Sequence, residues 1–593
     1  MCGIAGIVSS ELSGTVANDR VAQMQKALVQ RGPDDQGLIH FSNNKTIVSL
    51  AHTRLSIIDL SPTGHQPMTT KDGQLTIVFN GEIYNYQALK DELISKGESF
   101  NSNSDTEVIL KLYRQDGSKC LEKLRGMFAF FIWDKNKQRG FAARDPLGIK
   151  PFYFTQTDKS FAFASELRAV YKSDLASKNI SSPGLYSYFT AGSFAEPYSI
   201  LQDIQLLPAG HSLILKAGET HIEKYAAIRF NPQKIDNQQA IKITRQALQD
   251  SIAAHLVGDV SVGLFLSGGI DSTALLALAS QVSDKPINTY SITFKEKEWN
   301  EGKQAKRIAE HFGSNHTEWL ITHNLAQSMF NDFINAIDQP TIDGFNTYCV
   351  SKLAHENGEK VVLSGLGGDE LFAGYKSFQL LPRMHYWSKK TLSLIGFYRF
   401  LENEFNHLLP SKIRRTLDFF TEPDSLNSAH QSLRGIFSRQ EAITLLQDYS
   451  LSYTPIVENN SIAENQLDEI SHLELRSYMR NQLLRDSDTM SMVHGLELRV
   501  PLIDYKLLQS IAKIPAEIRL RYGKKLLIES VPEIPTWVIT QPKQGFRFPF
   551  DLWFKDQWHT SNTNKLAPKW IKLQPWYRAW NLLVLKQWLQ KNL

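Results

Sequence analysis

Short apolar runs follow one another through the first 170 residues, separated by turn-forming residues. The run MFAFFIW at 127–133 has the length and aromatic content of a buried strand. Longer stretches at 21–32, 86–97 and 104–117 have the apolar spacing of helices, and the last ends at Gly117, a helix stop signal. Many strands with few helices predict an α+β domain in which stacked sheets are flanked by helices.

The pattern changes from about residue 235. An amphipathic helix with apolar residues at Ile241, Leu248, Ile252 and Leu256 precedes the alternation VGLFL, STALLALASQV, INTYSITF, EGKQAKRIAEHFG and KVVLSG. Alternating strands and helices predict an α/β domain with a doubly wound parallel sheet. After about 375 the pattern is mainly helical. We therefore expect two domains, 1–210 and 230–593, with the stretch from 190 to 230 as their connection.

Composition and charge exclude several classes of protein. The 65 basic and 61 acidic residues give a net charge of +4, which provides no electrostatic case for a nucleic-acid partner. Three cysteines cannot build a disulfide framework and fit a reducing compartment. No signal-peptide pattern and no apolar stretch of about 18 residues occurs. We expect a cytoplasmic protein without a membrane partner.

The loop in VGLFLSGGIDST is a candidate phosphate site. A strand delivers Ser267, Gly268 and Gly269 to the start of a helix, where glycines let backbone amides approach an anion. The chain has no GxxxxGK[ST] match, so a Walker-type NTPase is not supported. The loop resembles the pyrophosphate-binding loop of ATP pyrophosphatases, although the same residues could form an ordinary tight turn.

A second loop of this kind, KVVLSGLGGDELFAGY, occupies 360–375. Asp369 and Glu370 follow its glycines, and carboxylates beside a phosphate loop suit Mg²⁺, which prefers oxygen ligands shared with phosphates. Alternatively, these acids only occupy the favourable first turn of a helix.

Cys2 directly follows the initiator methionine. Removal of Met1 would leave Cys2 with a free α-amine, whose pKa of about 7.7–8.0 suits a base near neutral pH. A nucleophile at the chain start can be activated by its own amine. The alternative is a cysteine without any chemical role.

The blocks MCGIAGIV, RGPDDQG, HTRLSIIDL, NGEIYNY, SDTEVI and RDPLGIKPFY, in this order, resemble the glutaminase domain of class II glutamine amidotransferases. Together with SGGIDS, SGLGGDELFAGY, RDSDTMSMVHGLELRVPLID and PKQGF, they make the chain similar to glutamine-hydrolysing asparagine synthetases. Only about 376–470 lacks a matching motif. The resemblance implies an αββα N-terminal-nucleophile glutaminase domain followed by an ATP-pyrophosphatase-type synthetase domain.

For the glutaminase domain, the resemblance implies that Cys2 attacks the glutamine side-chain amide while Asn80 and Gly81 form the oxyanion hole. Arg54 would pair with the substrate α-carboxylate, a task that suits a planar guanidinium, rather than form a surface salt bridge. The implied glutamine pocket consists of Arg54, Leu55, Ser56, Ile57, Ile58, Asn80, Gly81, Glu82 and Asp105.

For the synthetase domain, the resemblance implies that ATP and a carboxylic acid form an acyl-adenylate and pyrophosphate. Asp271 and Asp369 would lie near Mg²⁺, and Lys543 in QPKQGF would neutralise charge on the transferring groups. The implied ATP contacts are Phe265, Leu266, Ser267, Gly268, Gly269, Asp271, Ser272, Ile292, Ser364 and Gly365.

Three positions depart from the usual family pattern. Leu366 stands where a glutamate thought to help deprotonate ammonia is found, and Gln541 and Ile528 replace frequent arginines. All three lie in the half that handles the acceptor acid. We expect aspartate as acceptor, and keep as alternatives a sugar uronate or a natural-product or peptide carboxylate.

Two further alternatives belong to other classes of protein. An inactive binding or regulatory homologue is disfavoured because the site motifs are intact, and a plain N-terminal-nucleophile hydrolase is disfavoured by SGGIDS. The tryptophan-rich end, 570–593, is expected to pack on the synthetase domain as an amphipathic helix rather than lie on a membrane. Small molecules are the expected partners, and a homodimer is left open.

Overall fold

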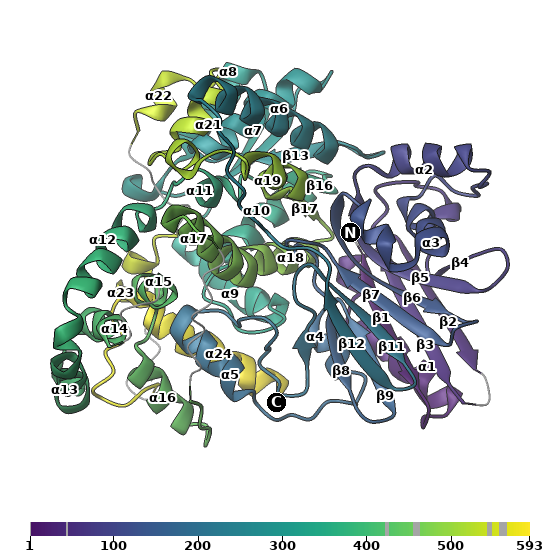
Figure 1. Ribbon diagram of the computed structural model, residues 1–593, viewed down its shortest axis with the longest axis horizontal. Coiled ribbons are helices and arrows are strands. Elements are labelled where there is room, and N and C mark those ends of the chain that lie inside the picture. The colour runs from purple at the N-terminus through teal and green to yellow at the C-terminus, as the bar shows by residue number, and fades with distance from the viewer. Residues whose placement is uncertain (1, 43–44, 422–425, 455–462, 542–547, 557–565) are drawn as a thin grey trace.

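The computed structural model describes residues 2–42, 45–421, 426–454, 463–541, 548–556 and 566–593. Its N-terminal part contains two six-stranded antiparallel sheets, shown in purple and blue in Figure 1. The first sheet has the order β10-β8-β9-β1-β3-β2 and the second β12-β11-β7-β6-β5-β4. The strands are β1 (Gly3–Ser9), β2 (Asp35–Ser42), β3 (Ile47–Arg54), β4 (Met68–Thr69), β5 (Leu75–Ile83), β6 (Gly126–Asp134), β7 (Arg139–Arg144), β8 (Tyr153–Gln156), β9 (Ser160–Ala164), β10 (Gln205–Leu206), β11 (His211–Lys216) and β12 (Glu219–Lys224).

The two sheets pack face to face through an aromatic core. Phe131 on β6 stacks on Phe163 of β9 with ring centroids 4.4 Å apart, and Ile4 and Val78 lie in the same core. Strand β6 is almost completely buried, which confirms the strand predicted at 127–133. Helices cover the outer faces: α1 (Gly14–Lys26) and α4 (Leu167–Tyr171) pack on the first sheet, and α2 (Tyr86–Ser95) and α3 (Asp105–Asp116) lie on the second's side. Helix α5 (Ser182–Ala191) instead packs on helices of the second half, where the Tyr188 hydroxyl donates to Asn581 O at 2.7 Å. The predicted layered fold is confirmed.

Two local predictions in this domain are wrong. The helix expected at 21–32 begins at Gly14, because the Ser13 side chain caps it by accepting from the Val16 amide, and it ends at Lys26. The stretch 190–230, expected to be a connection, instead contributes β10, β11 and β12 to the two sheets. Leu213 and Leu215 explain the second difference, because both are buried in the core between the sheets.

The second half contains a five-stranded parallel sheet in the order β15-β14-β13-β16-β17, which confirms the predicted α/β architecture. Its strands are β13 (Val262–Phe265), β14 (Asn288–Thr293), β15 (Asn315–Leu320), β16 (Val361–Leu363) and β17 (Glu497–Arg499). Its helices up to the second loop are α6 (Asn237–His255), α7 (Ile270–Val282), α8 (Gly302–Phe312), α9 (His323–Ala336), α10 (Phe345–Glu356) and α11 (Gly368–Leu371).

The remainder is mainly helical, as predicted. Its α-helices are α12 (Ser377–Lys390), α13 (Ile395–Phe405), α14 (Ser411–Phe420), α15 (Leu426–Arg434), α16 (Arg439–Gln447), α17 (Gln466–Leu473), α18 (Arg485–Met492), α19 (Tyr505–Ile511), α20 (Ala516–Arg519), α21 (Lys525–Ser530), α22 (Thr536–Ile539), α23 (Phe550–Asp556) and α24 (Trp576–Asn592). A π-helical segment, Glu474–Leu484, joins α17 to α18. Trp580 and Trp588 on α24 are buried, so the C-terminal helix packs inward as expected. Among the described residues, the chain forms no helix long and apolar enough to cross a membrane.

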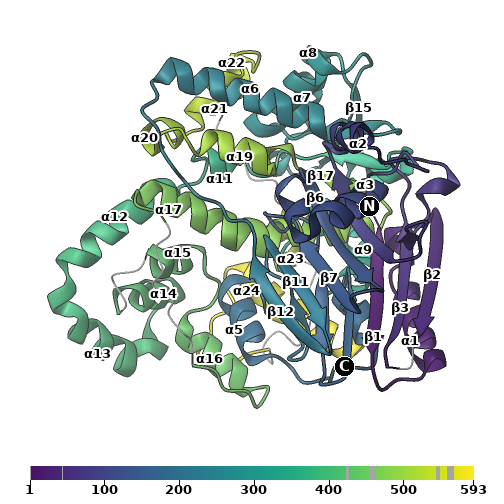
Figure 2. The ribbon, with the colours of Figure 1, turned by 45° about the vertical axis from the view of Figure 1, so that its right-hand side comes forward.

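Buried ion pairs join the two halves where they meet in Figure 2. Asp488 on α18 lies 2.8 Å from the Arg31 guanidinium and 3.4 Å from the Lys150 ammonium, and all three side chains are at most 4% exposed. Arg125 reaches Asp504 at 3.0 Å. These ion pairs therefore connect the N-terminal domain to α18 and to Asp504 of the second domain.

Candidate active sites

Cys2 lies at the start of β1, against the end of β5. Its main-chain nitrogen donates to Asn80 Oδ1 at 3.0 Å, while Asn80 Nδ2 is buried and has no hydrogen-bond partner among the described residues. Burial raises the pKa of the Cys2 thiol. A buried amide donor without a partner next to a thiol can stabilise a negative oxygen that forms when the thiol attacks a carbonyl.

Gly81, beside Asn80, occupies a position that only glycine fits. Its φ is +150°, and a Cβ there would lie 2.1 Å from the main-chain oxygen of Met127 on β6. The missing side chain lets β5 and β6 pair closely where Asn80 and Gly81, the expected oxyanion donors, lie.

Glu82 and Asp105 bring two buried carboxylates next to this point. Asp105 is the first residue of α3, and its Oδ2 accepts from the Ile83 amide at 3.0 Å. Burial raises the pKa of Asp105 to about 6 and that of Glu82 well above its usual range. Glu82 lies 3.8 Å from Arg499 of β17, so the glutaminase strand contacts the parallel sheet directly.

Arg54 organises the loop that follows β3. Its guanidinium donates to the main-chain oxygens of Ile58, Asp59 and Ser61, and it is 6% exposed, so it does not form the surface salt bridge considered above. The expected neighbours Leu55, Ser56, Ile57 and Ile58 are all buried. Asp59 ties this loop to the segment before Asp105, because its carboxylate accepts from the Asn103 amide at 2.9 Å.

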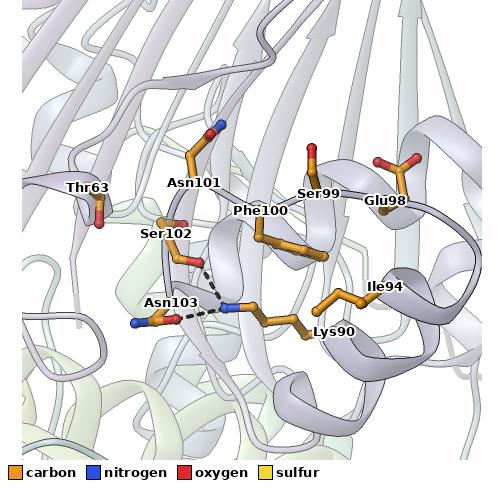
Figure 3. A pocket seen from close by; sticks show the side chains of 9 residues that line it. All are labelled: Thr63, Lys90, Ile94, Glu98, Ser99, Phe100, Asn101, Ser102 and Asn103. Atoms are coloured by element: carbon orange, nitrogen blue, oxygen red, sulfur yellow. Dashed lines mark hydrogen bonds between the residues drawn. The ribbon is translucent and has the colours of Figure 1, made fainter.

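A groove of about 430 Å³ borders the same loops on their outer side (Figure 3). Lys90 on α2 donates to Ser102 O at 3.0 Å and to Asn103 Oδ1 at 2.8 Å, and so fastens the segment that leads into Asp105. None of the residues expected to bind glutamine lines this groove, so it is separate from the thiol centre.

The two candidate phosphate loops lie side by side. They follow β13 and β16, which are paired in parallel, and a Cβ on Gly368 would lie 2.1 Å from Asp271 Oδ1. Within the first loop, Ser267 and Ser272 exchange a hydrogen bond at 3.0 Å, and the Gly269 amide donates to Ser267 Oγ at 3.2 Å. The loops predicted from two distant motifs therefore form one centre.

Lys524 lies between the two loops. Its ammonium donates to Asp271 and lies 2.6 Å from Asp369. Although burial disfavours the charge, the two carboxylates raise the pKa of Lys524 above its usual range. Both carboxylates therefore face the Lys524 ammonium. Two carboxylates that converge on a positive charge beside phosphate loops are also the arrangement that a Mg²⁺ site requires. The described residues contain no group of three or more His, Cys, Asp or Glu side chains that could hold a metal by themselves.

The other expected ATP contacts lie around this centre. Phe265 ends β13, and the Leu266 amide donates to Tyr290 O on β14, the strand that also carries Ile292. Ser364 and Gly365 begin the second loop, and a Cβ on Gly365 would lie 3.0 Å from the Ser272 amide. Lys543 lies outside the described residues.

Several residues at these centres were missed by sequence reasoning. No function was expected for Lys524, Glu301 or Arg499, although Arg499 lies within the block RDSDTMSMVHGLELRVPLID and Lys524 follows Gly523. Glu301 is mostly buried, which raises the pKa of its carboxyl, and it accepts from the Gly268 amide at 3.2 Å. Arg499 is fully buried and pairs with Glu497 at 2.6 Å.

Family models match both halves of the chain. One described as a glutamine amidotransferase domain matches residues 1–226, and one described as asparagine synthase matches residues 244–581. A thiol centre in an amidotransferase domain and a paired-loop centre on a parallel sheet define the class of glutamine-dependent amidating enzymes. Within that class, this chain belongs to the asparagine synthase family.

Curated relatives cover most of the chain. An asparagine synthetase [glutamine-hydrolyzing] 1 of Bacillus subtilis is 31% identical over 94% of this chain and 88% of that protein. A putative asparagine synthetase [glutamine-hydrolyzing] 2 of Methanocaldococcus jannaschii is 35% identical over 67% of this chain and 80% of that protein. A protein of Gibberella zeae named amidase chry2 is 28% identical over 93% of this chain and 90% of that protein.

Proposed function

We propose that this protein transfers ammonia from glutamine to a carboxylic acid at the expense of ATP, and that the acceptor is L-aspartate. The overall reaction converts L-aspartate, L-glutamine, ATP and water to L-asparagine, L-glutamate, AMP and diphosphate. The observation that carries the proposal is the presence in one chain of two centres, Cys2 with Asn80 and the buried Lys524 with Asp271 and Asp369. The proposal keeps two domains, with the second at 230–593 and the first extended from its expected end at 210 to Lys224, because β11 and β12 complete its second sheet.

At the first centre, removal of Met1 turns the Cys2 nitrogen into an amine that takes the thiol proton. Sγ then attacks the δ-carbon of glutamine, and Asn80 Nδ2 and the Gly81 amide donate to the oxygen that becomes negative. Arg54 pairs with the α-carboxylate and Asp105 with the α-ammonium, within the pocket of Leu55, Ser56, Ile57, Ile58 and Glu82. Collapse of the adduct expels ammonia, and water hydrolyses the thioester to glutamate.

At the second centre, an acceptor carboxylate oxygen attacks the α-phosphorus of ATP and displaces diphosphate. Backbone amides from Ser267 to Ser272 and at Gly365 surround the phosphates, and the Lys524 ammonium neutralises the leaving diphosphate. Mg²⁺, held by Asp271 and Asp369 together with phosphate oxygens, would supply further charge neutralisation. Ammonia then attacks the acyl-adenylate carbon, and AMP leaves.

A second candidate keeps this chemistry and changes the acceptor. Leu366, in the second loop, is an apolar side chain that packs against the core and can accept no proton. Relatives named amidase chry2 and amidase chyE show that curated names other than asparagine synthetase occur among proteins similar to this chain. A sugar uronate or a natural-product or peptide carboxylate is therefore the alternative substrate.

The test of the acceptor is diphosphate release from ATP, Mg²⁺ and glutamine with aspartate or with a panel of other acids, followed by mass spectrometry of the amide. Asparagine formed together with AMP supports aspartate. Hydrolysis of glutamine without any response to aspartate rules aspartate out and leaves the panel to identify the acid.

Cys2→Ala tests the division into two centres. We expect it to abolish glutamine-driven synthesis and to leave ammonia-driven synthesis unchanged, because the adenylating centre is intact. Loss of both activities in a folded variant would contradict the two-centre mechanism. Cys120→Ala, at a buried cysteine of the same domain for which no catalytic role is proposed, serves as the matched control.

A further inference from the structure

The helices at the outer edge of the synthetase half expose an unusual number of large apolar side chains. Ten of the 22 such side chains among the described residues lie between 380 and 413, a segment of 34 residues that we call the 380–413 surface. They include Tyr386, Trp387, Phe397 and Phe400, each more than half exposed, and Leu408, 70% exposed. Single exposed apolar residues are ordinary, but such a cluster marks an interaction site.

The surface lies away from both active centres. It is formed by α12, α13 and the start of α14, which occupy the edge of the molecule opposite the two antiparallel sheets in Figures 1 and 2. None of the residues assigned to glutamine, ATP or Mg²⁺ belongs to it. Its function is therefore independent of the proposed reaction.

The same surface is basic. Arg383, Lys389, Lys390, Arg399 and Lys412 are exposed, whereas Glu402 and Glu404 are the only acids in the segment. The Lys390 ammonium lies 4.6 Å from the ring centroid of Tyr386 and 5.9 Å from that of Trp387. Cations beside exposed aromatic rings are typical of helices that lie in the headgroup layer of an anionic bilayer, where the rings enter the acyl boundary and the charged ends stay with the phosphates.

Charge decides against the simplest protein partner, a second copy of this chain bound through the same surface. A two-fold contact of that kind would set the five cations against their own copies, which costs free energy, whereas an anionic lipid surface complements them. At 14 and 11 residues, α12 and α13 are also too short to span a bilayer, so contact would be peripheral.

We propose that the 380–413 surface docks the enzyme on an anionic membrane, with Trp387, Phe397 and Phe400 in the interface and the neighbouring lysines on lipid phosphates. This differs from the expectation of no membrane partner, which rested on the absence of a spanning segment. The sequence pattern did not disclose the surface because its exposed aromatic residues are divided between two helices, α12 and α13.

The test is flotation of the full-length protein with phosphatidylcholine vesicles, with and without phosphatidylglycerol. We expect binding only to the vesicles that contain phosphatidylglycerol, and weaker binding as salt rises. Lys389→Glu with Lys390→Glu should lower partition at least on the order of 30-fold, about fivefold for each charge removed. Phe397→Ser with Phe400→Ser should lower it comparably, while diphosphate release in solution stays at the wild-type level.

Matched controls are Lys242→Glu with Lys285→Glu and Ile222→Ser with Val16→Ser, all at exposed positions outside the surface. They should bind like the wild type. A second measurement follows insertion directly: brominated lipid should quench the fluorescence of Trp387, and Trp387→Phe should abolish that part of the quench while retaining binding.

Three results would overturn the proposal. The first is absence of wild-type binding to vesicles containing phosphatidylglycerol at low salt. The second is equal partition of the surface variants and the controls. The third is a wild-type dimer that the surface variants convert to a monomer without any vesicle binding, which would identify the surface as a contact between copies of the chain.

Discussion

In the proposed first step, the side-chain amide of Asn80 contacts both the nucleophilic residue and the developing oxyanion. Its oxygen accepts from the Cys2 nitrogen at 3.0 Å, and its nitrogen remains available to an oxyanion. We expect Asn80→Ala to lower glutamine hydrolysis about 10²- to 10³-fold, the usual effect of losing an oxyanion donor, and to leave ammonia-driven synthesis intact. Glutamate release and ammonia-driven diphosphate release measure the two activities. Gln87→Ala, at an exposed position on α2, is the control, and equal loss of both activities in Asn80→Ala would contradict the role.

Asp105 links the glutaminase centre to pH. Because burial raises its pKa to about 6, the carboxyl takes up a proton as pH falls below that value and loses its attraction for the glutamine ammonium. We expect kcat/KM for glutamine to fall about tenfold more per pH unit below about 6, in addition to the fall caused by protonation of the Cys2 α-amine. Asp105→Asn should give a lower value and lose the additional fall, so that only the dependence due to the α-amine remains. A flat wild-type profile would remove Asp105 from substrate binding.

At the scale of elements, three helix starts meet at the synthetase centre. The first turns of α7 and α11 carry Asp271 and Asp369, and Lys524 is the N-cap residue of α21. We expect Lys524→Met to lower diphosphate release on the order of 10²- to 10³-fold, as loss of a preorganised positive charge does, while glutamine hydrolysis persists.

Lys525 provides an adjacent control for Lys524. It is exposed, so Lys525→Met should behave like the wild type, and Lys524→Arg tests whether charge alone is sufficient. Thermal unfolding of each variant separates a chemical effect from misfolding. Wild-type diphosphate release by a folded Lys524→Met would exclude the ammonium from the reaction.

At the scale of the molecule, Asp488 of the second domain forms ion pairs with Arg31 and Lys150 of the first. Burial disfavours its charge, but Arg31 and Lys150 hold the pKa of its carboxyl below the usual range. Asp488→Asn would leave two buried cations facing a neutral amide, and we expect it to lower the free energy of unfolding by about 3–5 kcal/mol. Urea unfolding measures this, with Asp158→Asn, at an exposed site, as control. A loss below about 1 kcal/mol would show that the pairs contribute little.

From the sequence we could predict those groups of candidate site residues that lie close together along the chain. Asn80 and Gly81 belong to one strand, and Ser267 to Ser272 to one strand–loop–helix unit, so local geometry alone brings those residues together. The start of α1 was misplaced because the apolar spacing begins at residue 21, whereas the helix begins after Ser13, whose side chain caps it. The strands at 205–224 were taken for a connection because β10 and β11 pair with β8 and β7, which lie more than 50 residues earlier in the chain.

By itself, the sequence determined the two kinds of fold, since these depend on apolar periodicity, and it singled out Cys2 and two candidate phosphate loops as proposed sites, since each lies in one short contiguous block. Only the tertiary structure decided that Lys524 lies between Asp271 and Asp369, that Glu82 faces Arg499, and that aromatic and basic residues of α12 and α13 share one surface. Contacts between residues 100 or more positions apart depend on how whole elements pack. The periodicity within each element carries no information on which other element lies against it.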